Sequence, residues 1–302
     1  MTIGLLKALL YYRYGALWQA FFERLGCRVV ISEDTNQIIM AEGIRQSVGE
    51  CCLPVKVFLG HVASLAGRCD SIFIPRHERC CKGEEFCVRF WGLPDIARNT
   101  FPDLPILSCS RRGSELACFL ELGTALGKSW AETWRAYQFA QKAQQRLDEE
   151  LAQQQRATLT ASGSGPRVLL AAQPYIAHDP YIGGPLVRRI REQGAVPVFA
   201  DRCDRDRCHA LSRQISDDLY WMMNKEVIGA IPLLQSEVDG VILVTAFPCG
   251  TDSLVNELLL RRVRYLPLSH IVLDEQQGDA GLRTRIECFL DILRQRRQVN
   301  AG

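Results

Sequence analysis

Thirteen cysteines occur in this chain of 302 residues, and three of them stand where a predicted helix begins. Cys52 precedes a helix that opens with Pro54, and Cys87 precedes the short helix LPDIARN. Cys249 leaves a hydrophobic strand and enters another helix. The N–H groups and positive dipole at a helix N-terminus favour thiolate over thiol, and thiolates bind zinc or iron–sulfur clusters. The sequence therefore predicts metal or redox chemistry at these three positions.

The spacing of these three cysteines favours an iron–sulfur cluster over zinc. Zinc ribbons use close CxxC pairs, and the chain contains none. Two other thiol groups stay open as lesser metal sites, whereas Cys51, the neighbour of Cys52, is interpreted as an extra cysteine and not as a ligand. They are HERCCKGEEFC, with Cys80 and Cys81, and DRCDRDRCH, with Cys203 and Cys208.

The remaining cysteines lie inside predicted strands or helices, where we expect them to be buried as small hydrophobic side chains. An odd cysteine count without an export signal argues against a disulfide framework. Arg13 interrupts the apolar start of the chain, and no small-residue cleavage site follows, so we expect a cytoplasmic protein. The cysteines expected to be buried are Cys27, Cys69, Cys109, Cys118 and Cys288.

Composition excludes several classes of function. The net charge of +2 gives no overall attraction to nucleic acid or to an anionic membrane, and no stretch is apolar enough to span one. The chain has no GxxxxGK[ST] motif, no GxGxxG and no HExxH. His178 and Asp179 follow a predicted strand and are weak candidates for proton transfer; solvated loop residues are the more common case.

Strands and helices alternate along both halves, which predicts an α/β protein with two Rossmann-like parallel-sheet domains. We expect an N-terminal domain at residues 1–128, a connecting helix and linker at 129–165, and a C-terminal domain at 166–302. The predicted strands include 27–32, 70–76, 104–110, 167–173, 195–201, 238–247 and 266–274, and the predicted helices include 15–26, 54–67, 185–194, 251–263 and 280–297.

The connecting segment has its own helix signals. Ser129 and Glu132 form a capping-box pattern, and ASGSGP at 161–166 reads as a flexible link. One apolar stripe of this long helix is predicted to contain Trp130, Trp134, Tyr137, Leu147 and Leu151. At the C-terminal domain, Thr251 is the predicted N-cap of the helix after Cys249.

Five blocks in order carry a resemblance to a known family. They are IGLLKALLYYRYGALWQAFFERLG, CLPVKVFLGHVASL, FCVRFWGLPD, TAFPCGTDSLVNE and LDEQQGDAGLRTRIECFLD. With them, nearly the whole chain resembles the family related to the 2-hydroxyacyl-CoA dehydratase D-component, also described as acyl-CoA dehydratase activase-related, with double-cubane cluster proteins as relatives.

This resemblance implies an iron–sulfur protein whose cluster lies in a cleft between two Rossmann-like domains. The ligands carried over by position are Cys52, Cys87 and Cys249, and the cofactor is a 4Fe-4S or double-cubane 8Fe-9S cluster. An ATP-dependent activase or reductase would supply low-potential electrons, because the chain lacks an ATP-binding module. A homodimer is expected, and the setting is anaerobic.

Two alternatives stay open: a 2-hydroxyacyl-CoA dehydratase subunit, and a non-catalytic scaffold that holds a cluster. Val88 and Gln276 depart from the family pattern, where proline and histidine are frequent. Gln276 removes a proton donor and puts full enzymatic competence in doubt. Weak candidates for residues around the cluster are His61, Asp274, Glu275 and Arg285, although an ion pair between Arg285 and Glu287 on a helix surface is equally expected.

Overall fold

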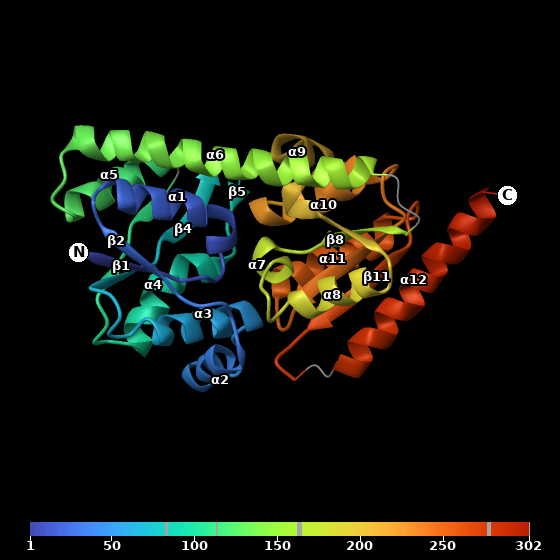
Figure 1. Cartoon of the computed structure of the whole chain (residues 1–302), viewed down its shortest axis with the longest axis horizontal. Coiled ribbons are helices and arrows are strands. Elements are labelled where there is room, and N and C mark those ends of the chain that lie inside the picture. Colours follow the sequence, from blue (N-terminus) through green and yellow to red (C-terminus); the bar gives the residue numbers. More distant parts are fainter. Residues whose placement is uncertain (82–83, 113, 162–164, 277–278, 302) are drawn as a thin grey trace. The chain divides into compact units, whose positions relative to one another are not determined.

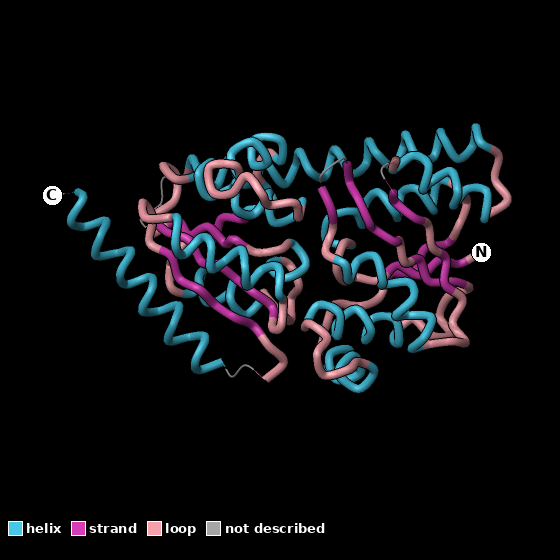
Figure 2. Tube along the Cα trace, turned by 180° about the vertical axis from the view of Figure 1, so that it is seen from behind, coloured by secondary structure: helices cyan, strands magenta, loops and turns pink. Residues whose placement is uncertain are grey.

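The computed structural model describes residues 1–81, 84–112, 114–161, 165–276 and 279–301. The chain forms two compact units (Figures 1 and 2). The first contains Met1–Glu149 with Tyr220–Met222, and the second contains Glu150–Leu219 with Met223–Gly302. Each has its own parallel sheet, so the predicted α/β class with two parallel-sheet domains is confirmed.

The sheet of the first unit contains four parallel strands in the order β2-β1-β3-β6. Strand β1 is central and apolar, and its Ile3 and Leu5 are fully buried. The strands are β1 (Thr2–Leu5), β2 (Arg28–Ile31), β3 (Ser71–Phe73) and β6 (Ile106–Leu107).

Helix α1 (Tyr11–Arg24) joins β1 to β2 and buries the apolar face that the sequence predicts. Trp18 and Phe22 pack edge-on against Phe73 of β3. The helix ends at Gly26, whose φ of 81° suits glycine best.

Helices α2 (Gln37–Gln46) and α3 (Leu53–Ser64) form the crossover from β2 to β3. They cross at two glycines. A Cβ on Gly43 would lie 1.9 Å from the carbonyl oxygen of Lys56, and one on Gly60 would lie 2.0 Å from the carbonyl oxygen of Ile39. Only glycine therefore lets these two backbones approach so closely.

The first unit also contains a small sheet in the order β5-β4-β7, and two further helices. The Cys109–Cys118 disulfide links the segment before β7 to α5. Burial of these two cysteines is confirmed, but the bond itself was not expected from the sequence. The elements are β4 (Arg76–Cys81), β5 (Glu84–Glu85), α4 (Val88–Thr100), β7 (Ser110–Arg112) and α5 (Glu115–Ala125).

Helix α6 (Trp130–Thr160) contributes to both units. The predicted capping box is confirmed, because Glu132 accepts hydrogen bonds from the backbone N–H and the hydroxyl of Ser129. The predicted apolar stripe is wrong at its start: Trp130 is 64% exposed and stacks on Trp134, which is 39% exposed. Leu147 is also 39% exposed, whereas Tyr137 is buried as predicted, together with Thr133, Ala136 and Ala140.

The sheet of the second unit has the order β11-β10-β8-β9 and is also parallel. Counted along the chain, the second strand of each sheet is an edge strand beside the first strand. The third and fourth strands lie on the opposite side of the first strand. The strands are β8 (Arg167–Ala171), β9 (Val196–Phe199), β10 (Gly240–Ala246) and β11 (Leu268–Leu273).

Helices α9 (Arg205–Ser212) and α10 (Met222–Leu234) form the crossover from β9 to β10. Here too a glycine brings two helices together, since a Cβ on Gly229 would lie 1.9 Å from the carbonyl oxygen of Cys208. The other helices are α7 (Pro174–Ala177), α8 (Gly184–Glu192), the 3₁₀ turn η1 (Ala200–Arg202), α11 (Gly250–Arg262) and α12 (Asp279–Ala301).

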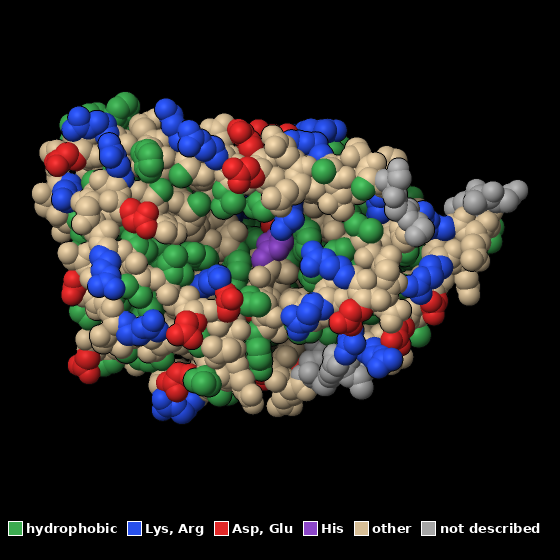
Figure 3. Space-filling view, in the orientation of Figure 1, with side chains coloured by type: hydrophobic (Ala, Val, Ile, Leu, Met, Phe, Trp, Pro, Cys, Tyr) green, Lys and Arg blue, Asp and Glu red, His purple; other side chains and the backbone are tan. Residues whose placement is uncertain are grey.

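Charges of both signs are interspersed over the face shown in Figure 3, in keeping with a net charge of +2. Within the described residues, every helix is too short or too polar to cross a lipid bilayer.

Candidate functional site

Each of the three predicted ligand cysteines is the N-cap residue of a helix. Cys52 caps α3, Cys87 caps α4 and Cys249 caps α11. The predicted placement at helix starts is therefore confirmed, although α4 begins at Val88 and not at the predicted Leu93, and the predicted cap Thr251 is wrong by two residues. Cys52 and Cys87 belong to the first unit, and Cys249 belongs to the second.

Their thiols do not perform the usual task of an N-cap side chain. Asn36, Ser114 and Asp204 each accept a hydrogen bond from a backbone N–H in the first turn of the helix that they cap. None of the three thiols has a first-turn N–H in hydrogen-bond geometry, although the Val55 N–H lies near enough to Cys52 to affect its pKa, and none of the three is in a disulfide. Cysteine is not a preferred N-cap residue, so helix stability does not explain its choice at these three starts.

Cys52 and Cys87 lie close enough for their thiols to interact electrostatically. Burial raises the pKa of Cys52, the backbone N–H of Val55 lowers it in part, and Cys87 raises it further. Arg89 contributes a small lowering effect. The expectation that a helix N-terminus favours the thiolate is thus wrong for Cys52, because removal from water outweighs the N–H group.

Cys249 of the second unit lies beside a buried carboxylate. Its Sγ is 3.4 Å from the hydroxyl oxygen of Thr251. Burial raises the pKa of Asp252, and the hydrogen bonds from Gln173 and Asn224 lower it in part, as does the nearby thiol of Cys249. The sequence pattern TDS gives no sign of this role, because an acidic residue in a first helical turn is usually exposed.

Two side-chain amides donate hydrogen bonds to Asp252. Gln173 Nε2 donates to Asp252 Oδ1 at 3.0 Å, and Asn224 Nδ2 donates to the same oxygen at 2.9 Å. The exposed fractions of Gln173, Asn224 and Asp252 are 3%, 5% and 5%. We call these three residues the amide–carboxylate cluster. Sequence reasoning missed all three, since they come from distant segments.

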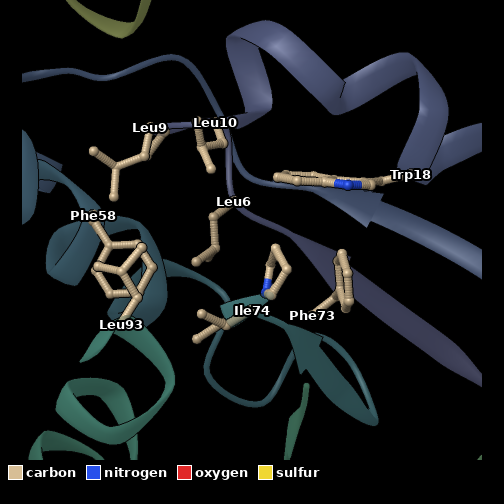
Figure 4. Close-up of a pocket in the computed structure, with 10 residues that line it drawn as sticks. Leu6, Leu9, Leu10, Trp18, Phe58, Phe73, Ile74 and Leu93 are labelled. Carbon is tan, nitrogen blue, oxygen red and sulfur yellow. The ribbon is translucent and has the colours of Figure 1, made fainter. Parts of the chain in front are cut away.

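The equivalent position in the first unit is apolar (Figure 4). A cavity of about 20 Å³ lies where β1 and β3 end. Leu6, Leu9 and Leu10 line it from the β1 side, and Ile74 lines it from the β3 side. Leu9 has a φ of 50°, and no other described residue except glycine has a positive φ. The space holds about one water molecule.

His61 is fully buried near the ends of β1 and β2. Its Nδ1 lies 2.8 Å from the hydroxyl of Ser32, and its Nε2 lies 2.9 Å from the hydroxyl of Thr35. Burial lowers its pKa to about 4; Asp34 opposes this effect slightly, and Lys7 adds slightly to it. A neutral imidazole with both nitrogens engaged is a structural group of the first unit.

The other candidates for residues around the cluster are surface groups. Asp274 is exposed and accepts a hydrogen bond from the backbone N–H of Gln276. The expected ion pair between Arg285 and Glu287 is wrong, because Glu287 pairs with Arg283. Val88 is the first residue of α4 and 68% exposed, a position where proline would also fit.

His178 and Asp179 have separate tasks. His178 Nε2 lies 2.9 Å from Oδ2 of Asp201. Asp179 is 1% exposed, and its Oδ1 accepts hydrogen bonds from the backbone N–H groups of Tyr181 and Ile182. The expectation of a solvated loop residue is wrong for Asp179, which shapes the turn before α8.

The remaining cysteines differ in environment. Cys51 and Cys208 are buried. Contrary to their predicted burial, Cys27 and Cys69 are partly exposed and Cys288 is exposed. Cys288 faces outward because α12 buries Phe289 and Leu290 instead.

Two cysteine pairs, Cys203 with Cys208 and Cys80 with Cys81, were predicted as lesser metal sites. Gln155 Nε2 lies 3.7 Å from Cys203 Sγ, and a hydrogen bond from Cys208 raises the pKa of Cys203. The side chains of Cys80 and Cys81 lie outside the described part of the structure. Among the described side chains, no three His, Cys, Asp or Glu residues are grouped to hold a metal ion.

The donors nevertheless suit an iron–sulfur cluster. The cap thiols are soft ligands that make no capping bond. In the amide–carboxylate cluster, Oδ2 of Asp252 and Oε1 of Gln173 are buried without a hydrogen-bond partner among the described residues. Such oxygens can accept hydrogen bonds from a bound group or its water.

Comparisons with known proteins give one informative match. A family model described as CoA enzyme activase uncharacterised domain matches residues 2–202, which is about two thirds of the 302 residues. No curated protein matches the chain.

Among solved structures, the chain is similar to the SBP FpvC from Pseudomonas aeruginosa in complex with Mn2+, at 13% identity and a TM-score of 0.28, over 100% of this chain and 99% of that one. The same protein with Ni2+ gives 12% identity and a TM-score of 0.28, over 100% and 98%. Likenesses at this TM-score carry no argument about fold or function.

Proposed function

Because the chain belongs to the CoA enzyme activase domain family, we propose that it is an iron–sulfur protein acting with an ATP-dependent activase or reductase. The protein would receive low-potential electrons and use them in reduction or electron transfer. Membership of this family supports a role related to acyl-CoA dehydratase activation.

One observation carries the cluster proposal: three helices begin with a cysteine whose thiol makes no capping bond. In this proposal Cys52, Cys87 and Cys249 bind a 4Fe-4S or double-cubane 8Fe-9S cluster through their sulfur atoms. When bound, such a cluster supplies one-electron transfer at low potential. Three cysteines leave one iron of a cubane without a cysteine ligand.

The residues around the thiols have tasks of their own in this proposal. The N–H groups at each helix start and the nearby Arg89 stabilise negative charge on the sulfur atoms. Leu53, Val55 and Phe58 of α3 are buried and keep water from the Cys52 side. Metal binding would release the thiol protons, which burial otherwise retains at Cys52.

The test is anaerobic purification with iron and sulfide analysis. We expect each of Cys52→Ser, Cys87→Ser and Cys249→Ser to lose most of the bound iron and the visible absorption. Cys203→Ser, Cys208→Ser and the exposed Cys288→Ser are matched controls that should keep both. If colour and iron survive all three of the first replacements, the ligand assignment is wrong.

The electron-transfer role needs a second measurement. Mixing the loaded protein with a family activase, ATP and a reductant should bleach the cluster absorption, and omission of ATP should prevent it. Turnover of an acyl-CoA by the chain with activase would instead indicate a dehydratase subunit. Stable cluster binding without reduction or turnover would indicate a scaffold. We also propose a homodimer, which light scattering of the purified protein tests.

A further inference from the structure

The amide–carboxylate cluster occupies the place where a doubly wound sheet binds ligands. In the second unit, β9 lies on one side of β8 and β10 lies on the other, so the chain reverses its direction of winding between β8 and β10. Ligands of such sheets bind outside the carboxyl ends of the strands at this point. Gln173 caps α7 just after β8, and Asp252 lies in the first turn of α11 just after β10.

Asp252 does not behave as an ordinary acid near a helix start. As the third residue of α11, it has the position from which an acidic side chain usually reaches back to the N-cap N–H or faces solvent. Here the side chain is turned inward and is 95% buried, because its exposed fraction is 5%. Burying a carboxylate is costly unless it is hydrogen-bonded.

The hydrogen bonds satisfy only one of its oxygens. Gln173 and Asn224 both donate to Oδ1, whereas Oδ2 has no partner with hydrogen-bond geometry among the described residues. Leaving a buried acceptor unsatisfied destabilises the folded state. A carboxylate needed only to join α7, α10 and α11 would have both oxygens engaged. The unused oxygen therefore indicates a task beyond structure.

The thiol of Cys249 lies close to the Asp252 carboxylate, and its Sγ has Thr251 Oγ1 at 3.4 Å. We propose that Asp252, clamped by Gln173 and Asn224, is a positioning residue for Cys249. It fixes the direction of the Cys249 sulfur and presents Oδ2 at the crevice. The inference rests on the proposed function, in which Cys249 binds the cluster.

The test uses anaerobically loaded protein and does not depend on activity. Asp252→Asn keeps the size of the side chain and an oxygen for the two amides, but it removes the carboxylate beside Cys249. We expect the variant to fold and bind iron, to lose iron to a chelator about 10-fold faster, and to show an altered electron paramagnetic resonance signal and visible circular dichroism.

Asn224→Ala is the second variant, because Asn224 supports the carboxylate from behind. It should change the same signals in the same direction but less, and it decides the question if Asp252→Asn does not fold. Asp204→Asn is the matched control, since Asp204 caps α9 and asparagine also caps well. That variant should have wild-type spectra and iron retention.

The two proposals fail in different ways. If Cys249→Ser keeps its iron and colour, the ligand assignment fails. If Cys249→Ser loses iron while Asp252→Asn and Asn224→Ala retain wild-type spectra and chelator resistance, the positioning role of Asp252 is overturned and its bonds only join helices.

Discussion

The two units have the same strand order. Numbered along the chain within each unit, both sheets have the order second, first, third, fourth. In both, the crossover from the second to the third strand is a pair of helices that meet at a glycine, Gly43 in one unit and Gly229 in the other. The side chains at the point where the winding reverses, however, differ between the two units.

In the first unit this point is an apolar cavity lined by Leu6, Leu9 and Ile74. In the second unit it holds buried amides and a carboxylate, Gln173, Asn224 and Asp252. Strand order sets where a crevice forms, and the side chains at the strand ends decide what it can bind. The two units therefore share a topology but not the polarity of the side chains at their strand ends.

The helix-pair crossings give the largest expected effect in both units. Gly43→Ala and Gly229→Ala would each place a methyl group 1.9 Å from a backbone carbonyl oxygen. That oxygen cannot move without its helix, so we expect a loss of about 3 kcal/mol in the free energy of unfolding. Chemical denaturation measures it. Equal losses would support equivalent crossovers, and no loss in either would contradict the close approach.

Gly281→Ala is the control for this pair. Gly281 lies in α12, and nothing lies within 4 Å of an added Cβ. Because alanine favours helix over glycine, this variant should gain about 0.5–1 kcal/mol.

The buried histidine of the first unit should give a strong pH dependence. Its folded pKa of about 4 lies below the value of 6.5 for an exposed histidine, so the unfolded chain binds the proton more readily. Stability is fully present above pH 6.5 and is lost as the pH falls through 4, by up to about 3 kcal/mol. His61→Gln should flatten the curve of unfolding free energy against pH between these values.

The second unit offers a weaker counterpart. His270 Nε2 lies 3.0 Å from the hydroxyl of Thr245, and burial lowers its pKa, aided by Arg285. Since His270 is only partly buried, His270→Gln should flatten the curve less than His61→Gln. An equal or larger flattening for His270→Gln would show that the pKa of His61 is not the more strongly shifted of the two.

Helix caps give the smallest expected effect. Asn36 Oδ1 accepts hydrogen bonds from the N–H groups of Ile38 and Ile39, whereas Asp204 Oδ1 accepts one from Arg207. Asn36→Ala and Asp204→Ala should each cost about 1 kcal/mol, with the larger loss for Asn36. Denaturant midpoints measure both, and Asn36→Asp and Asp204→Asn should stay near wild type. A larger loss for Asp204 would reverse the comparison.

Much of the fold follows from the sequence, because apolar runs and punctuating glycines are local signals. The cap positions of Cys52, Cys87 and Cys249 were predictable in the same way. The amide–carboxylate cluster was not, since Gln173, Asn224 and Asp252 come together only through the sheet order. The same holds for the Cys109–Cys118 disulfide.

The two errors over apolar faces share one physical cause. Trp130 and Trp134 were assigned to a buried stripe because they are large and apolar, and Cys288 because it lies within a helix. Hydrophobic character does not decide which side of a helix meets a neighbour, and small residues such as Ala136 and Ala140 form the packed side of α6.

The paired glycines of α2 and α3 restrict how this sequence can diverge. Any substitution at Gly43 or Gly60 meets a main-chain oxygen of the opposite helix, so no compensating change of side chain elsewhere can make room. Related sequences that keep this pair of helices must keep glycine at both positions. Glycine at both positions is therefore a sequence feature by which the segment that contains Cys52 can be identified in related proteins.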